Sequence, residues 1–135
     1  MNRVIKMFLI KIIVCILFIS CDRSHYMDMY VINKCSENIE VITHRNYVGN
    51  EVWNYEIVPN MECKINYAEI IFSIKRGDIP VFFERLEIKK KGIEININSL
   101  DTNYWNFEII SKDNAFKGTY YRSKATLIVY DEYFE

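Results

Sequence analysis

The sequence predicts an all-β protein, an antiparallel β-sandwich of immunoglobulin or transthyretin type with seven to nine short strands. Apolar and polar residues alternate along most of the chain, and turn-forming residues interrupt this alternation about every ten residues. Aromatic residues, which favour strands, make up 15% of the sequence. Strands with one apolar and one polar face are expected where two sheets share a core. A closed barrel is the alternative architecture.

The expected strands follow one another along the chain. They cover about residues 30–32, 39–43, 53–57, 61–67, 82–88, 93–97, 105–109 and 119–130. The first two are expected to pair as a hairpin, and Pro59-Asn60 and residues 89–92 are expected to be turns. Residues 93–97 give the clearest strand pattern, whereas residues 68–76 fit either a strand or one or two helical turns.

Composition limits the class of protein. The 135 residues are enough for one domain, and 50% are hydrophobic, with only four glycines and two prolines. These values exclude a disordered or linker-rich chain. The formal charge of −1 argues against a nucleic-acid partner, because nucleic-acid binders carry a basic surface.

Residues 1–20 have the features of a secretory signal peptide. Arg3, Lys6 and Lys11 are its only charged residues, and the apolar run from Ile12 to Ile19 follows them. This run is shorter than the roughly 20 apolar residues that a membrane span needs. A retained transmembrane anchor is the alternative interpretation.

The end of the apolar run, Phe18-Ile19-Ser20-Cys21, resembles the lipobox of bacterial lipoproteins. The resemblance implies that Cys21 carries the lipid and becomes the first residue of the mature chain. Residues 21–28 are then the lipidated cysteine and a short tether, and residues 29–135 form the sandwich domain. Loss of residues 1–20 removes three basic residues and no acid, which leaves 14 basic and 18 acidic residues and a formal charge of −4.

The stretch Thr126–Phe134 resembles the ending of small lipoproteins of Bacteroidetes, which close with a T-L-x-V strand followed by a D-E-x-F tail. Residues 30–33 and 39–41 resemble the opening hairpin of these proteins, and Trp105 lies where they carry a Trp before the last strand. The resemblance implies a β-sandwich lipoprotein of unknown function at the outer membrane. It supplies no catalytic residues.

Two cysteines remain for pairing after export, since Cys15 leaves with the signal and Cys21 is acylated. An oxidising envelope favours a disulfide between Cys35 and Cys63. In an up-and-down succession of strands, the turn that holds Cys35 and the Pro59-Asn60 turn lie at the same end of the domain. The alternative is that Cys63 is a small buried hydrophobic residue.

The sequence lacks the residue patterns of common catalytic and metal sites. A serine hydrolase needs a histidine, and His25 falls in the expected tether, so only His44 remains; no G-x-S-x-G is present. Cys35, Cys63 and His44 do not have zinc-ligand spacing. No glycine-rich phosphate loop occurs. We therefore expect no enzymatic activity, no metal and no cofactor.

Aromatic residues divide into an expected core and an expected surface group. The residues assigned to one core are Trp53, Tyr55, Trp105, Phe107, Leu127 and Val129. Tyr104, Tyr120 and Tyr133 are candidates for an exposed aromatic contact. The sequence favours a non-enzymatic binding or structural module, anchored in the cell envelope at the outer membrane, with an envelope protein or a glycan as partner. The alternative is an immunity- or inhibitor-type lipoprotein that neutralises an envelope toxin or hydrolase.

Overall fold

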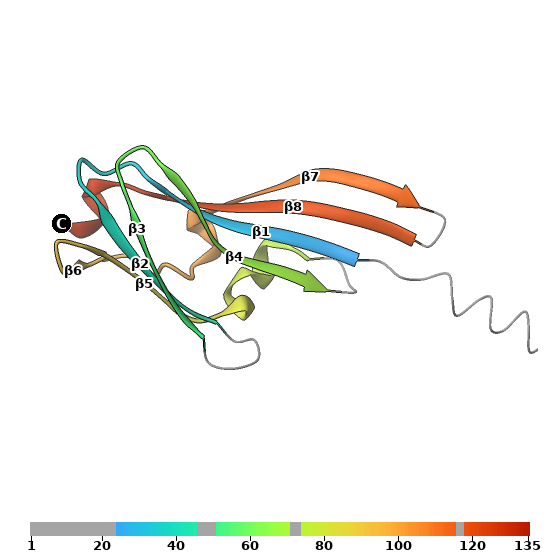
Figure 1. The fold of residues 1–135 in the computed structure, drawn as a ribbon, viewed down its shortest axis with the longest axis horizontal. Helices are drawn as coiled ribbons and strands as arrows, with labels where there is room; N and C mark the ends of the chain where they lie inside the picture. The colour runs from blue at the N-terminus through green and yellow to red at the C-terminus, as the bar shows by residue number, and fades with distance from the viewer. Residues whose placement is uncertain (1–23, 46–50, 71–73, 116–117) are drawn as a thin grey trace, which may run out of the picture.

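The structure, a computed structural model, describes residues 24–45, 51–70, 74–115 and 118–135. This part of the chain folds into an all-β sandwich with eight strands in two four-stranded sheets, which confirms the predicted fold class (Figure 1). The strands are β1 (Ser24–Asn33), β2 (Ile39–Arg45), β3 (Val52–Ile57), β4 (Glu62–Ile70), β5 (Phe83–Lys90), β6 (Ile93–Glu94), β7 (Trp105–Ala115) and β8 (Gly118–Val129). Three 3-10 helices accompany them: η1 (Arg76–Phe82), η2 (Thr102–Tyr104) and η3 (Asp131–Phe134).

The first sheet, called sheet A here, has the strand order β4-β1-β8-β7. The first and last strands lie side by side in its centre and run parallel, with Ser24 opposite Tyr120 and Asn33 opposite Val129. The other two pairs are antiparallel. In Figure 1 the strands of sheet A extend well past the other sheet. Residues far apart in the sequence therefore meet on one continuous face.

The second sheet, sheet B, has the order β3-β2-β5-β6 and is antiparallel throughout. Its β5–β6 hairpin closes through Lys91 and Gly92, which both have positive φ, 50° and 80°. Two such residues match the right-handed twist of paired strands, and glycine adopts this conformation without a steric penalty. The structure thus confirms the turn predicted at residues 89–92.

The expected first hairpin is wrong, because β1 and β2 belong to different sheets. The buried side chain of Asn33 holds the connection between them. Its amide nitrogen donates hydrogen bonds to the carbonyl oxygens of Glu37 and Ile57, and its Oδ1 accepts one from the Cys35 amide. This local network directs the chain from one sheet to the other instead of back along β1.

The clearest strand pattern, at residues 93–97, yields only the two-residue strand β6. Beyond it, the Asn96 amide donates to the carbonyl oxygen of Tyr133 in the C-terminal tail. Asn98 then starts a turn, in which its Oδ1 accepts from the Leu100 amide. Asparagine favours such turns, and its hydrogen bonds here replace strand pairing. The ambiguous residues 68–76 divide between the end of β4 and the start of η1.

The expected tether is shorter than predicted. Strand β1 begins at Ser24, and the side chains of His25 and Met27 are buried in the domain. The polar and charged residues of the segment 22–28 suggested a tether, but its inward-facing residues, a histidine and a methionine, belong to a strand. Cys21 and the predicted signal peptide, residues 1–20, lie outside the described residues.

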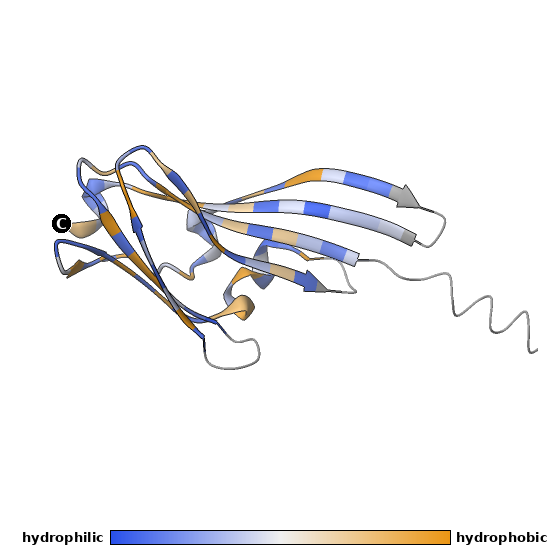
Figure 2. Cartoon of the chain, viewed as in Figure 1, coloured by the Kyte–Doolittle hydropathy of each residue, from blue (hydrophilic) through white to orange (hydrophobic). Residues whose placement is uncertain are grey.

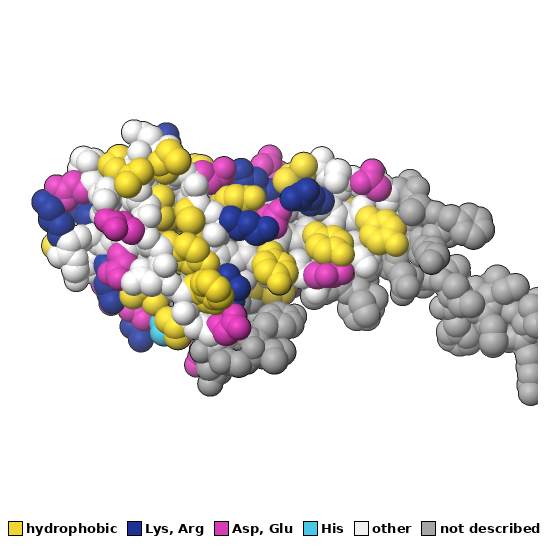
Figure 3. All heavy atoms as spheres, viewed as in Figure 1, with side chains coloured by type: hydrophobic (Ala, Val, Ile, Leu, Met, Phe, Trp, Pro, Cys, Tyr) yellow, Lys and Arg dark blue, Asp and Glu magenta, His cyan; other side chains and the backbone are white. Residues whose placement is uncertain are grey.

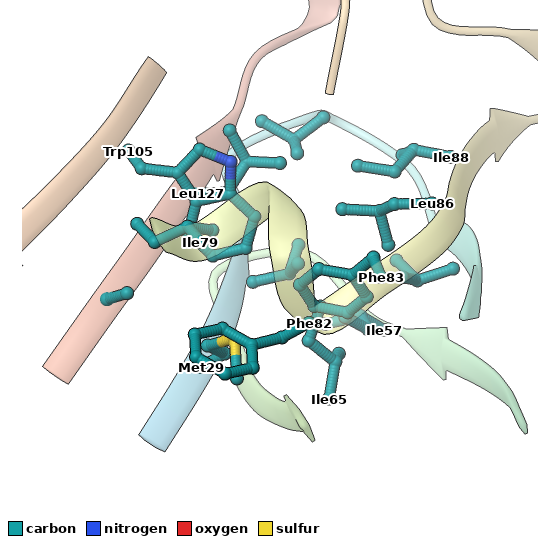
Figure 4. Close-up of a cluster of buried hydrophobic side chains, with 14 of the residues drawn as sticks. Met29, Ile57, Ile65, Ile79, Phe82, Phe83, Leu86, Ile88, Trp105 and Leu127 are labelled. Carbon is teal, nitrogen blue, oxygen red and sulfur yellow. The ribbon is translucent and has the colours of Figure 1, made fainter. Parts of the chain in front are cut away.

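The core lies between the sheets and is completed by η1, whose Ile79 and Phe82 point into it (Figure 4). Figure 2 shows the alternation of apolar and polar residues along the strands that produces this core. Of the residues predicted for the core, Trp105, Leu127 and Val129 are fully buried, and Tyr55 and Phe107 pack against it.

Trp53 is the exception among the predicted core residues, since 47% of its surface is exposed. It shares a face of β3 with Ile57, which is buried, but β3 is an edge strand and burial falls along it towards Trp53. The Arg45 guanidinium covers the Trp53 ring at 5.3 Å from its centroid. The alternation of residues along the strand indicates the correct face, but it does not show that the other sheet no longer covers this face at Trp53.

The C-terminal tail closes one end of the sandwich. Asp131 accepts a hydrogen bond from the Ser36 amide at 2.9 Å and pairs with the Lys90 ammonium at 2.8 Å. Phe134 packs on the core and lies 4.8 Å from the same ammonium. The acidic and aromatic residues of the tail thus connect η3 to the β1–β2 connection and to sheet B.

Candidate functional site

The most distinctive surface of the described chain is the outer face of sheet A, turned away from sheet B. Tyr67 on β4, Tyr26 on β1 and Tyr120 on β8 lie there in a diagonal row, which we call the tyrosine platform. The register gives this arrangement, because Tyr67 is opposite Asp28 and Tyr120 is opposite Ser24, two residues to either side of Tyr26. Residues directly opposite each other in neighbouring strands point to the same face.

The platform residues differ in exposure. Tyr67 is 61% exposed and Tyr26 is 43% exposed, whereas Tyr120 is half-buried. The space-filling view shows hydrophobic side chains in a row over this face, with basic and acidic side chains beside them (Figure 3). Large exposed aromatic side chains that gather on one face are typical of a contact surface.

An ion cluster lies beside the row. Asp28 is 8% exposed, and its carboxylate pairs with the Lys64 ammonium and, at 3.0 Å, with the Arg122 guanidinium. Burial alone would raise the pKa of Asp28, but the hydrogen bonds from these two cations hold it below its ordinary value. The carboxylate is therefore charged at neutral pH and fixes both cations close to the sheet.

Two further polar pairs lie on this face. The Lys124 ammonium forms an ion pair with Glu62 and lies 4.6 Å from the centroid of the Tyr30 ring. The pKa of Tyr26 is raised, chiefly by the hydrogen bond of its hydroxyl to Glu69. Tyr26 is thus a neutral hydrogen-bonding group at physiological pH.

The structure separates the three tyrosines that the sequence proposed as an exposed contact. Tyr120 belongs to the platform. Tyr104 is 38% exposed and packs edge-on against half-buried Tyr133, whose ring also meets Tyr130 edge-on. This second group lies beside the C-terminal tail. Of the predicted set, the structure brings Tyr104 and Tyr133 together and leaves Tyr120 apart from them.

Tyr26 and Tyr67 were not among the tyrosines predicted to be exposed. Tyr26 was assigned to the tether, although it alternates with the buried residues Met27 and Met29. In the expected strand at residues 61–67, simple alternation puts Tyr67 on the same face as Ile65, but a β-bulge in β4 at Ile65 shifts the register between Met29 and Tyr30. A bulge reverses the parity of all later residues, so Tyr67 points outward.

The predicted disulfide does not form, because Cys35 and Cys63 are both free thiols. The two turns do meet, since the Asn60 amide donates to the carbonyl oxygen of Asn33. Cys63, however, lies within β4 opposite Val31, whereas the buried Cys35 thiol contacts the carbonyl oxygen of Val129. The chain therefore places Cys35 beyond the end of the β1–β4 pairing.

His25 is a structural residue of the core. Its Nδ1 accepts a hydrogen bond from the Ile74 amide at 2.7 Å, so the neutral ring carries its proton on Nε2, which donates to the Ser123 hydroxyl at 2.9 Å. Burial lowers the pKa of His25, although Asp78 opposes the shift. With both ring nitrogens engaged, His25 has no lone pair available to activate Ser123.

Sheet B carries an open hollow of about 550 Å³ on its outer face. Glu40 and Glu56 lie directly opposite each other there, and the side-chain amides of Asn54 and Asn38 donate to them at 2.6 and 2.7 Å. Lys89 also lines the hollow, and its ammonium pairs with Glu87. No aromatic side chain lines this hollow, which distinguishes it from the tyrosine platform.

Residues 24–45, 51–70, 74–115 and 118–135 contain no group of three or more His, Cys, Asp or Glu side chains arranged to hold a metal ion. They also contain no helix long and apolar enough to cross a bilayer. Comparison with known proteins found no match among family models, curated proteins or solved structures.

Proposed function

We propose that this chain is an envelope lipoprotein, anchored through Cys21, whose sandwich is a non-enzymatic binding module. The charged start, the apolar run and the lipobox-like Phe18–Cys21 support the anchor. The tyrosine platform supports the binding role and is the observation that carries it. Its residues stand on three paired strands, so a ligand meets side chains whose backbone is already ordered.

Tyrosine suits such a role on physical grounds. Its ring supplies a large contact area, its hydroxyl supplies a hydrogen bond, and only two torsion angles must be fixed on binding. Tyr67 exposes such groups at the edge of sheet A, and Tyr26 exposes them at its centre. A surface of this kind can hold a partner without a cleft or a catalytic group.

The anchor would keep the platform near the membrane. Strand β1 begins at Ser24, three residues after Cys21, and a fully extended chain spans at most about 3.6 Å per residue. The start of β1 would then lie within about 11 Å of the lipidated residue. Tyr26 and Tyr120 are near this end of sheet A, so the proposed ligand is one that occurs close to the bilayer surface.

Site-specific photocrosslinking in cells that produce the full-length lipoprotein tests this proposal. A photoreactive benzoylphenylalanine at position 67 should form an adduct in the intact envelope. The same residue at position 93 is the control, because Ile93 is 57% exposed but belongs to sheet B. Adducts at 67 above the level at 93 support the binding face, and equal levels at both positions contradict it.

A further inference from the structure

We infer that the tyrosine platform binds an extended, electrically neutral glycan, an inference that rests on the binding function proposed above. The length of the row is the first reason. Diagonal neighbours on adjacent strands lie about 7–8 Å apart, so the row from Tyr67 through Tyr26 to Tyr120 spans about 15 Å. This length fits several consecutive sugar rings rather than a single small molecule.

The chemistry of the row suits sugar rings. Pyranose rings present apolar C–H faces that pack on aromatic rings, and their hydroxyl groups need hydrogen-bond partners. Tyr67 and Tyr26 offer exposed aromatic surface, and Lys64 and Arg122 remain 44% and 60% exposed beside them. The ion pairs to Asp28 fix these donors at the edge of the row, where they can reach hydroxyl groups of a bound chain.

The charge of the face excludes a polyanion as the preferred ligand. The register places three cations and five carboxylates on this face: Lys64, Arg122 and Lys124, and Asp28, Glu62, Glu69, Glu108 and Asp113. Each of the three cations already forms an ion pair with one of these carboxylates. An acidic polysaccharide or an anionic lipid surface would meet excess negative charge, whereas a neutral glycan would not.

The position of the ion cluster argues against a protein partner. The centres of protein–protein interfaces are depleted in charged residues, and burial of an ion pair costs desolvation energy. Here Asp28 and Arg122 lie on the central strands of sheet A and Lys64 lies on the adjoining edge strand β4, directly beside the tyrosines. A hydrated glycan can leave such ions in contact with water and hydroxyl groups, so it avoids that cost.

Affinity electrophoresis tests the ligand class. The detergent-solubilised full-length lipoprotein is run in native gels that contain a soluble neutral glucan, mannan, xylan or galactan, or the acidic polymer polygalacturonate. We expect retardation by at least one neutral polymer, unchanged by added salt. Tyr67→Ala should weaken it about tenfold, as expected for truncation of an exposed aromatic contact residue, and Tyr67→Phe should retain it. Tyr104→Ala is the matched control, since Tyr104 is exposed outside the platform.

Three results would overturn the inference: no retardation by any neutral polymer, retardation by polygalacturonate alone that salt abolishes, and equal weakening by Tyr67→Ala and Tyr104→Ala. Flotation with phosphatidylethanolamine and phosphatidylglycerol vesicles tests a lipid ligand. It compares Cys21→Ala protein with Cys21→Ala/Tyr67→Ala protein, because both lack the lipid and both retain residues 1–20. Vesicle binding that depends on Tyr67 would also contradict a glycan ligand. The photocrosslinking experiment distinguishes the two proposals. A protein adduct at position 67 would support the binding module and contradict only the glycan ligand. Equal adducts at positions 67 and 93 would contradict both proposals.

Discussion

His25 and Ser123 are 98 residues apart in the sequence, yet their side chains are hydrogen-bonded in the core, with 2.9 Å between Nε2 and Oγ. The bond joins the parallel strands β1 and β8. On its other side the imidazole accepts a hydrogen bond from the Ile74 amide just before η1. A single neutral side chain thus connects the first strand, the last strand and the segment that enters η1.

This arrangement predicts a loss of stability in mild acid. Because burial lowers the pKa of folded His25 below its ordinary value of 6.5, the unfolded chain takes up a proton first as the pH falls. The contribution of His25 is complete above about pH 6.5 and is lost progressively below it. Urea titrations between about pH 8 and pH 5 measure this decline.

Two variants identify the residue responsible. His25→Gln should flatten the decline, because glutamine can hydrogen-bond but does not titrate, and His44→Gln should retain it. Asp28 and Glu87, whose folded pKa values lie below 3.8 and 4.5, add a separate loss at lower pH. An unaltered pH dependence in His25→Gln would show that His25 does not cause the effect.

Trp105 and Trp53 should respond in opposite ways to truncation. Trp105 is fully buried and donates a hydrogen bond from Nε1 to the carbonyl oxygen of Ser99 at 2.8 Å. Trp105→Ala should therefore reduce the free energy of unfolding by about 3–5 kcal/mol. Trp53→Ala, at a 47% exposed position, should cost less than about 1 kcal/mol. Similar losses for both variants in denaturant titration would contradict the assigned core.

The two cysteines should remain free thiols with different reactivity. Burial raises the pKa of Cys35 to about 11, and it also raises the pKa of half-buried Cys63. Alkylation of native, unreduced protein should modify Cys63 first and Cys35 only on unfolding. Mass spectrometry of the alkylated protein checks this order, and a mass two hydrogens lower with no alkylation would reveal a disulfide instead.

Cys21 should be the lipid attachment site. Cys21→Ala should abolish incorporation of radiolabelled palmitate and leave the precursor at full length. Cys63→Ala is the matched control, because it removes a cysteine of the mature domain and should leave labelling unchanged. Continued labelling of the Cys21→Ala protein would refute the proposed anchor.

Local patterns predicted the strands better than they predicted the pairing of the strands. Period-two alternation located β3 and β8 within a few residues, because each buries one face against the other sheet; it found the start of β7, which runs on to Ala115 and not to residue 109. The parallel contact of β1 with β8 depends on partners about 95 residues apart, and no local pattern encodes it. Residues 93–97 alternate clearly, but the hydrogen bonds of Asn96 and Asn98 outweigh that pattern.

The candidate site was predictable only in part. Tyr120 was singled out as a surface aromatic residue, and the parity of β8 supports that choice. Tyr67 could not be placed, since the bulge at Ile65 reverses the face on which it lies. Tyr26 was predictable in principle, because it alternates with Met27 and Met29, but its polar neighbours suggested a tether.

The central claim is that the outer face of sheet A contacts a ligand in the envelope. Hydroxyl-radical footprinting with mass spectrometry, on intact cells and on the purified full-length protein, measures this contact directly. We predict that Tyr67 and Tyr26 are oxidised less in the envelope than in the purified protein. Trp53 and Tyr104, exposed aromatic residues outside the platform, should be oxidised equally in both. Equal oxidation of Tyr67 and Tyr26 in the two samples would contradict the claim.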